Sequence, residues 1–180
     1  MKKTLIALVV AVAPIPAAFA ASGNTINFVG EVTDQTCNVA INGSNANPTV
    51  LLPTVSASEL DTANKVAGKT NFTISVSGCK AETADKAIKT VFVGNQLSGG
   101  NLQNTATGTS AATLVALQLF DPAKSSAPFD LSKGGHTASG LTLKKGEENA
   151  SYDFAVQYFS EGKATAGAVN GNVQYMLSYQ

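Results

Sequence analysis

Apolar and polar residues alternate with a period of two along most of this sequence, and this alternation constrains the fold more than any other feature. It is clearest at 72–76, 115–119 and 152–158. A period of two places successive side chains on opposite faces of a strand, so each stretch predicts a strand with one buried face. Helical periodicity is nearly absent; the best candidate is 58–66, where one or two helical turns are expected after Ser58.

Turn-forming stretches separate the predicted strands. Glycine-rich segments lie at 98–101, 133–135 and 166–167. Several short strands joined in this way predict an all-β protein, a β-sandwich of immunoglobulin-like architecture. The polar stretch 95–110 is long for a loop, so it is either a mobile excursion or contains a short strand. No internal repeat or change of composition divides the chain, so one domain is expected.

The first 20 residues have the layout of a secretory signal peptide. Lys2 and Lys3 precede an apolar run at 5–13, and Ala18-Phe19-Ala20 supplies small residues around a cleavage point after Ala20. The apolar run is far shorter than the roughly 20 residues that a membrane-spanning helix needs. Residues 1–20 are therefore expected to direct export and to be removed, with no membrane insertion of the remaining chain.

The chain that remains has 160 residues, which is enough to bury the core of one domain. It carries 10 lysines against 12 acidic residues and no arginine. Arginine supplies most bidentate contacts to phosphates and bases, so no nucleic-acid partner is expected. No basic cluster is longer than Lys144-Lys145, which also argues against binding to an anionic membrane surface.

Two cysteines, Cys37 and Cys79, are expected to form a disulfide, because export places them in an oxidising compartment. A bridge closing a loop of about 43 residues would stabilise the fold by roughly 4 kcal/mol on the chain-entropy model. A metal site would need further histidine or cysteine ligands, and a catalytic cysteine would need a base. Neither accompanies these two residues in the sequence.

The apolar pattern changes parity near the N-terminus. Ile26, Phe28 and Val32 share one parity, whereas Val39 and Ile41 have the other. A strand changes faces only at a bulge or a break, so the residues before about 33 and after about 36 are expected to pack against different partners. Either one bulged strand crosses between the two sheets of a sandwich, or the first segment belongs to the core of another molecule.

The last residues of the sequence, 169–179, alternate equally well. They predict a final strand that is either the last strand of a closed sandwich or an edge strand available to pair with another chain. The alternation alone favours the closed sandwich.

The sequence resembles the pilins of chaperone-usher fimbriae, the type 1 pilus group. The resemblance covers nearly the whole chain after residue 20, and the order and spacing of several stretches carry it. These stretches are 30–39 with the first cysteine, 51–56, 77–79 with the second cysteine, Tyr158-Phe159, 162–167, and the terminal 175–180.

This resemblance implies an immunoglobulin-like domain at 30–180 that lacks its last strand. A periplasmic chaperone first lends a strand, and an outer-membrane usher replaces it with the N-terminal extension of the next subunit. In this sequence the donor segment would be 21–29, with Ile26 and Phe28 as the inserted side chains. The acceptor groove and the chaperone-recognition residues would be Val39, Ile41, Gly167, Val173, Tyr175, Leu177, Tyr179 and Gln180.

Candidate catalytic residues are few, so no enzyme and no cofactor are expected. His136 is the single histidine and is predicted to lie in a solvated loop. The stretch 63–70 ends like a phosphate-binding loop but has Ala63 in place of the first glycine. Glu147-Glu148 are interpreted as surface charges in a turn.

The predicted function is therefore a structural pilus subunit that polymerises by donor-strand exchange into a surface filament supporting adhesion. Its expected partners are identical or related pilins, the chaperone and the usher. The alternative is a secreted or fimbria-associated binding module, a sandwich that does not polymerise. An exported enzyme ranks third.

Overall fold

The computed structural model describes residues 30–35, 37–124 and 127–179. The chain divides into two units, Met1–Gly30 and Glu31–Gln180, and every described helix and strand lies in the second. The donor residues Ile26 and Phe28 lie outside the described residues, as do the signal segment and Gln180. The elements are β1 (Asn38–Ile41), η1 (Ala57–Leu60), β2 (Val66–Ser77), β3 (Lys86–Ala87), β4 (Lys89–Gly94), β5 (Leu97–Ser98), β6 (Asn101–Gln103), β7 (Val115–Phe120), β8 (His136–Ala138), β9 (Thr142–Leu143), β10 (Ala150–Ser160) and β11 (Val173–Ser178).

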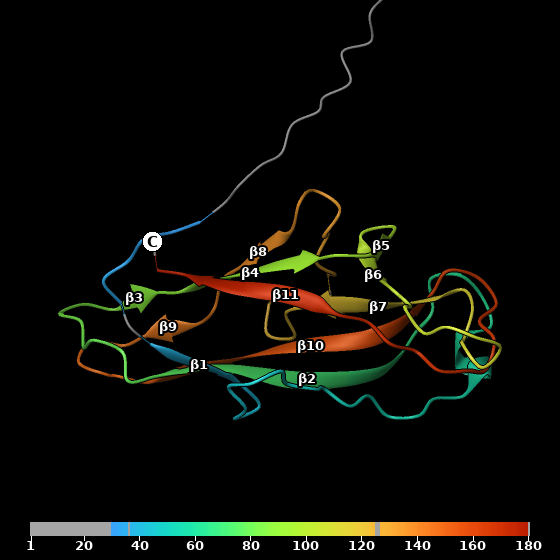
Figure 1. Cartoon of the computed structure of the whole chain (residues 1–180), viewed down its shortest axis with the longest axis horizontal. Coiled ribbons are helices and arrows are strands. Elements are labelled where there is room, and N and C mark those ends of the chain that lie inside the picture. The colour runs from blue at the N-terminus through green and yellow to red at the C-terminus, as the bar shows by residue number, and fades with distance from the viewer. Residues whose placement is uncertain (1–29, 36, 125–126, 180) are drawn as a thin grey trace, which may run out of the picture. The chain divides into compact units, whose positions relative to one another are not determined.

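Two principal sheets make up the fold, as Figure 1 shows. The larger has the order β1-β2-β10-β7-β6-β5, and the smaller has the order β11-β4-β8. A short ribbon of β3 and β9 forms a third sheet. The predicted all-β, immunoglobulin-like sandwich is confirmed, since the arrangement corresponds to the two antiparallel sheets of that architecture.

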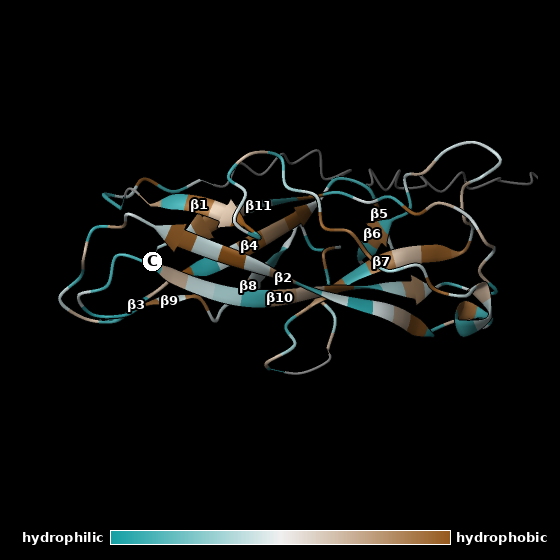
Figure 2. Ribbon diagram, turned by 90° about the horizontal axis from the view of Figure 1, so that it is seen from below, coloured by the Kyte–Doolittle hydropathy of each residue, from teal (hydrophilic) through white to brown (hydrophobic). Residues whose placement is uncertain are grey.

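An aromatic cluster joins the inner faces of the two sheets. Phe92 on β4 lies edge-on to Phe154 on β10, with ring centroids 5.1 Å apart, and to Phe72 on β2, at 6.4 Å. Inner residues of β2 such as Ile74 are fully buried, whereas its outer residues are partly or fully exposed. Figure 2 shows this alternation as brown and teal bands along the strands. The period-two pattern therefore gave the correct inner face of β2.

Strand β7 departs from the predicted single buried face, because all six of its residues are buried. Two of its outward residues, Gln118 and Phe120, contact polar side chains. Gln118 donates to Asn101 and accepts a hydrogen bond of 2.9 Å from Gln157, and the Lys69 ammonium lies 5.3 Å from the centroid of the Phe120 ring.

The predicted helix at 58–66 is shorter and begins earlier. It is the 3-10 helix η1, capped by Ser56 and closed by a hydrogen bond of 3.0 Å from the Ser56 amide to Glu59. This capping box, two residues before the serine expected to cap the helix, fixes its start. Val66 already belongs to β2. Among the described residues, no helix is long and apolar enough to cross a membrane.

The polar stretch 95–110 contains short strands, one of its two predicted forms. Strands β5 and β6 form a hairpin around Gly99 and Gly100, whose φ angles are 55° and 85°. Two successive positive φ values are what a tight two-residue hairpin turn needs, and glycine adopts them without strain.

His136 is not in a loop, contrary to the prediction. It begins β8, pairs with Phe92, and stacks on Phe129 with ring centroids 4.2 Å apart. Desolvation in this half-buried position lowers the pKa of His136, so the imidazole is neutral at neutral pH.

Candidate functional site

Strand β11 forms one wall of an open groove. It pairs with β4 on one side, from Val173 opposite Gly94 to Ser178 opposite Lys89, and no described residue pairs with its other side. None of its six residues is fully buried, and Tyr175 is 38% exposed. Its free edge therefore presents backbone donors and acceptors to a further strand.

The segment 47–52 forms the opposite wall. Within the described part of the chain, no backbone hydrogen bond involves Thr49, Val50, Leu51 or Leu52. Val50 and Leu52 pack against the core, whereas Leu51 between them is 84% exposed. This alternation is that of a strand without a partner.

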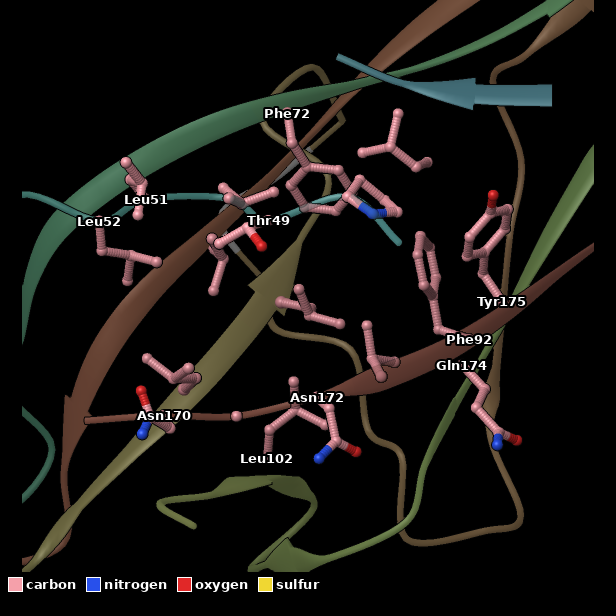
Figure 3. Close-up of a pocket in the computed structure, with 18 of the residues that line it drawn as sticks. Thr49, Leu51, Leu52, Phe72, Phe92, Leu102, Asn170, Asn172, Gln174 and Tyr175 are labelled. Atoms are coloured by element: carbon pink, nitrogen blue, oxygen red, sulfur yellow. The ribbon is translucent and has the colours of Figure 1, made fainter. Parts of the chain in front are cut away.

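The groove between these walls encloses about 940 Å³ and opens directly onto the sandwich core (Figure 3). Its floor is apolar and comes from both sheets. The floor residues are Phe72 and Ile74 of β2, Phe92 of β4, Leu102 of β6, Leu117 and Leu119 of β7, and Val156 and Tyr158 of β10. A groove of this composition suits an extended segment with apolar side chains at alternate positions.

The position of the groove matches a missing strand of the immunoglobulin fold. In that fold one sheet has the order A-B-E-D and the other C-F-G. Here β1-β2-β10-β7 corresponds to the first, and β4-β11 corresponds to C and F. Strand G would lie beside β11, on the edge that no described residue pairs with.

The structure places the predicted acceptor residues in three settings. Ile41, Val173 and Tyr175 line the groove. Val39 and Leu177 are half-buried against the main core, which also contains the buried Tyr179. These residues follow one another along β1 and β11, but only the first three border the open volume.

Gly167 lies away from the groove lining and has a packing role. A Cβ atom there would come within 2.4 Å of the Ala112 amide nitrogen. The chain at 167–168 runs alongside 110–112, where Ala168 and Ala111 form a parallel bridge. Only glycine fits this approach of two backbones.

Asn104 organises one end of the groove, a role that the sequence analysis missed. Its amide nitrogen donates to the carbonyls of Ala112 at 2.8 Å and Ala168 at 3.1 Å. Its amide oxygen accepts from the backbone of Asn170 at 2.9 Å. Asn170 lines the groove, so this side chain fixes the segment that leads into β11.

Segment 47–52 was also missed as a groove wall. The detectable signal was the alternation of Val50 and Leu52 between Pro48 and Pro53. Proline lacks an N–H group, so a strand between two prolines is confined to an edge.

The disulfide between Cys37 and Cys79 is present and joins residues 42 positions apart. It ties the residue before β1 to the end of β2, beside the pairing of Asn38 with Ser77. Among the described residues, no group of histidine, cysteine, aspartate and glutamate side chains could hold a metal ion.

Glu31 connects the start of this unit to its C-terminal strand. One of its carboxylate oxygens accepts a hydrogen bond of 3.0 Å from the backbone amide of Tyr179. The Ser178 hydroxyl and this amide hold the pKa of Glu31 below its usual value, assisted by Lys86 and Lys89.

The fold and the groove together define a class of protein, the immunoglobulin-like sandwiches in which the position of one strand is open. The family model described as Fimbrial protein matches residues 26–180, and the chain belongs to this family. It is 36% identical over 185 residues to the F17 fimbrial protein of Escherichia coli, with 100% of both chains covered.

Another relative is the S-fimbrial protein subunit SfaA of Escherichia coli O6:K15:H31 (strain 536 / UPEC). The identity is 34% over 164 residues, covering 88% of this chain and 84% of that protein. Among solved structures, the P pilus rod subunit PapA superposes with a TM-score of 0.56 at 15% identity, covering 79% of this chain and 99% of that chain. This likeness supports the fold.

Proposed function

We propose that this fimbrial subunit polymerises by donor-strand exchange, in which segment 21–29 of one copy fills the groove of the next. The chain is a structural subunit of a fimbrium, exported to the cell surface, and its relatives are structural fimbrial proteins. The observation that carries the proposal is the groove between 47–52 and β11, whose floor is the core itself. Ile26 and Phe28 are the proposed inserted side chains.

Backbone pairing on both walls favours such an insertion. An extended donor would meet the free edge of β11 on one side and the unpaired segment 49–52 on the other. Main-chain hydrogen bonds then supply affinity, and alternate side-chain pockets supply register. Burial of two large apolar side chains adds roughly 3 to 6 kcal/mol.

The joint is expected to be long-lived. Withdrawal of the donor would re-expose floor residues such as Phe72 and Phe92 to water, so dissociation resembles partial unfolding. A subunit with an empty groove presents an apolar edge that favours aggregation. In the proposed pathway, a periplasmic chaperone covers the groove with a strand of its own and recognises Gln180 among other residues. An usher then exchanges the chaperone's strand for the donor segment of the next subunit.

Assembly in vitro tests the proposal. The chaperone-bound subunit beginning at Ala21 should form multimers that resist heat and detergent, and a chain lacking 21–29 should not. Phe28→Asp should lower the yield of multimers at least roughly tenfold, because the carboxylate would be buried without a partner. Asn27→Asp is the matched control, since it adds the same charge at the opposite parity and should still assemble.

Two results would contradict the proposal. One is the formation of resistant multimers by the chain without 21–29. The other is an equal loss of assembly in the Phe28 and Asn27 variants, which would point to net charge rather than to an inserted side chain. No described feature favours a binding module that does not polymerise.

A further inference from the structure

The residues that follow the proposed donor segment are held at the same end of the unit as the C-terminus of β11. Glu31 accepts its hydrogen bond from Tyr179 across 148 positions of sequence. Figure 1 shows the start of the second unit, drawn in blue, near the C-terminal end of β11. The contact therefore joins Glu31, shortly after the proposed donor segment, to Tyr179, the residue directly after the strand that forms the groove wall.

Two lysines contribute positive charge near this contact. Lys86 of β3 and Lys89 of β4 act on the Glu31 carboxylate, and Lys89 pairs with Ser178 across the sheet. Charge-assisted hydrogen bonds from a hydroxyl and a backbone amide are stronger than neutral ones. The carboxylate is thus bound through charge and geometry rather than through packing.

Neighbouring residues hold the same segment further along. Asp34 forms an ion pair of 2.9 Å with Lys80, and Gln35 donates to the Lys80 carbonyl and to Glu82. The disulfide then anchors Cys37. Val32, in contrast, is fully exposed. Glu31 is the first of these anchors after the extension and the one that reaches the residue following β11.

We propose that Glu31 is a positioning residue that couples the two joints of each subunit in the filament. This inference rests on the proposed donor-strand exchange. In that arrangement the extension enters one neighbour, while β11 receives the donor of the other. The Glu31 contact links these two joints through one carboxylate and one amide, so it limits how far adjacent subunits bend relative to each other.

The first test measures the contact itself in assembled filaments. Glu31→Ala should increase amide hydrogen exchange at Tyr179 roughly fivefold, because its acceptor is lost. Glu31→Gln keeps an oxygen acceptor without the charge and should have a smaller effect. Glu147→Ala removes a glutamate in the exposed turn at 144–147 and serves as the control.

The second test measures filament stiffness by electron microscopy. Glu31→Ala should reduce the persistence length of the filaments roughly twofold. The persistence length of Glu31→Gln filaments should lie between those of Glu31→Ala and the wild type. Ser178→Ala, which removes the hydroxyl partner, should also soften the filament, and combining it with Glu31→Ala should add little. Heat and detergent resistance of the multimers should not change, since the groove remains intact.

The outcomes separate this inference from the proposed function. Filaments of normal stiffness in Glu31→Ala would overturn the positioning role while leaving donor-strand exchange standing. Loss of multimers in Glu31→Ala would also overturn it, because Glu31 would then act on insertion rather than on the link between joints. Resistant multimers from a chain lacking 21–29 would instead contradict donor-strand exchange itself.

Discussion

Strands β10 and β11 share an alternating sequence pattern but lie in different environments. Both alternate aromatic and aliphatic residues with polar ones. Strand β10 pairs with β2 on one side and β7 on the other, and Phe154 at its centre is fully buried. Strand β11 pairs only with β4 among the described residues, and none of its residues is fully buried.

The difference shows that alternation defines the faces of a strand but not its neighbours. A central strand gains stability from two hydrogen-bonded partners and a covered face. An edge strand with the same pattern keeps half of its backbone groups available, and these become an interface. This contrast can be tested on the subunit by urea unfolding followed by tyrosine fluorescence or circular dichroism, since the chain has no tryptophan.

The largest expected effect is at the centre of β10. Phe154→Ala should destabilise the subunit by about 3 to 5 kcal/mol, because it leaves a cavity among Phe72, Phe92 and Phe129. The midpoint of urea unfolding measures this. A loss below about 1 kcal/mol would mean that the core repacks and that β10 tolerates truncation like an edge strand.

The next largest effect is expected from loss of the disulfide, which anchors the edge strand β1 at Cys37. Without it, β1 is held, like β11, by pairing with a single strand among the described residues. The double substitution Cys37→Ser and Cys79→Ser should cost about 2 to 5 kcal/mol, since the unfolded chain gains freedom. Unfolding with and without reductant checks the result. Reductant should have no further effect on the variant; an unchanged unfolding midpoint in the variant would contradict the prediction.

A smaller effect is expected where β10 meets the buried Asp121. The Tyr152 hydroxyl donates to the Asp121 carboxylate at 2.9 Å, and Tyr152→Phe should cost about 1 to 3 kcal/mol by leaving that buried group short of a donor. Tyr158→Phe is the control on the same strand. Its hydroxyl donates to the exposed carbonyl of Pro53 at 3.2 Å and should matter less.

The subunit should tolerate truncation of an aromatic side chain on β11 better than on β10. Tyr175→Ala is expected to change unfolding by less than about 1 kcal/mol, because the side chain is partly exposed. The same variant should assemble less efficiently, since Tyr175 lines the groove. A large loss of stability without a loss of assembly would reverse the contrast between the two strands.

The smallest effect concerns pH. The Lys80 ammonium holds the pKa of Asp34 below its usual value of 3.8, so the pair contributes stability above that pH. This contribution is lost as the pH falls through the lowered pKa of the folded state. Asp34→Asn should therefore flatten the decline of stability below about pH 4 slightly, measured by unfolding across pH.

Much of the sandwich could be predicted from the sequence, because a strand with one buried face has apolar and polar residues that alternate with a period of two. The strands at 72–76 and 152–158 were found in this way, and the strand predicted at 169–179 was found as the shorter β11, Val173–Ser178. Strand β7 kept the pattern but not the exposed face, since hydrogen bonds such as that of Gln118 with Gln157 satisfy its buried polar groups. The sequence does not record such long-range pairings.

The site was predicted less completely for the same reason. Ile41, Val173 and Tyr175 were placed by alternation and resemblance, and they line the groove. The wall at 47–52 has an alternation at Val50 and Leu52, but the stretch between Pro48 and Pro53 is too short to predict a groove wall without the fold. Asn104 contacts Ala168 and Asn170, which lie more than 60 positions away, and no local pattern indicates these contacts.

The groove floor described above has a genetic consequence. If the donor of one copy completes the core of another, Phe92 and Leu117 serve folding and assembly at once. A change at Ile26 would then behave as a core mutation in a different molecule. Its phenotype should be suppressible in trans by a compensating volume change in the floor of the recipient, so mixed filaments of two variants could succeed where each alone fails.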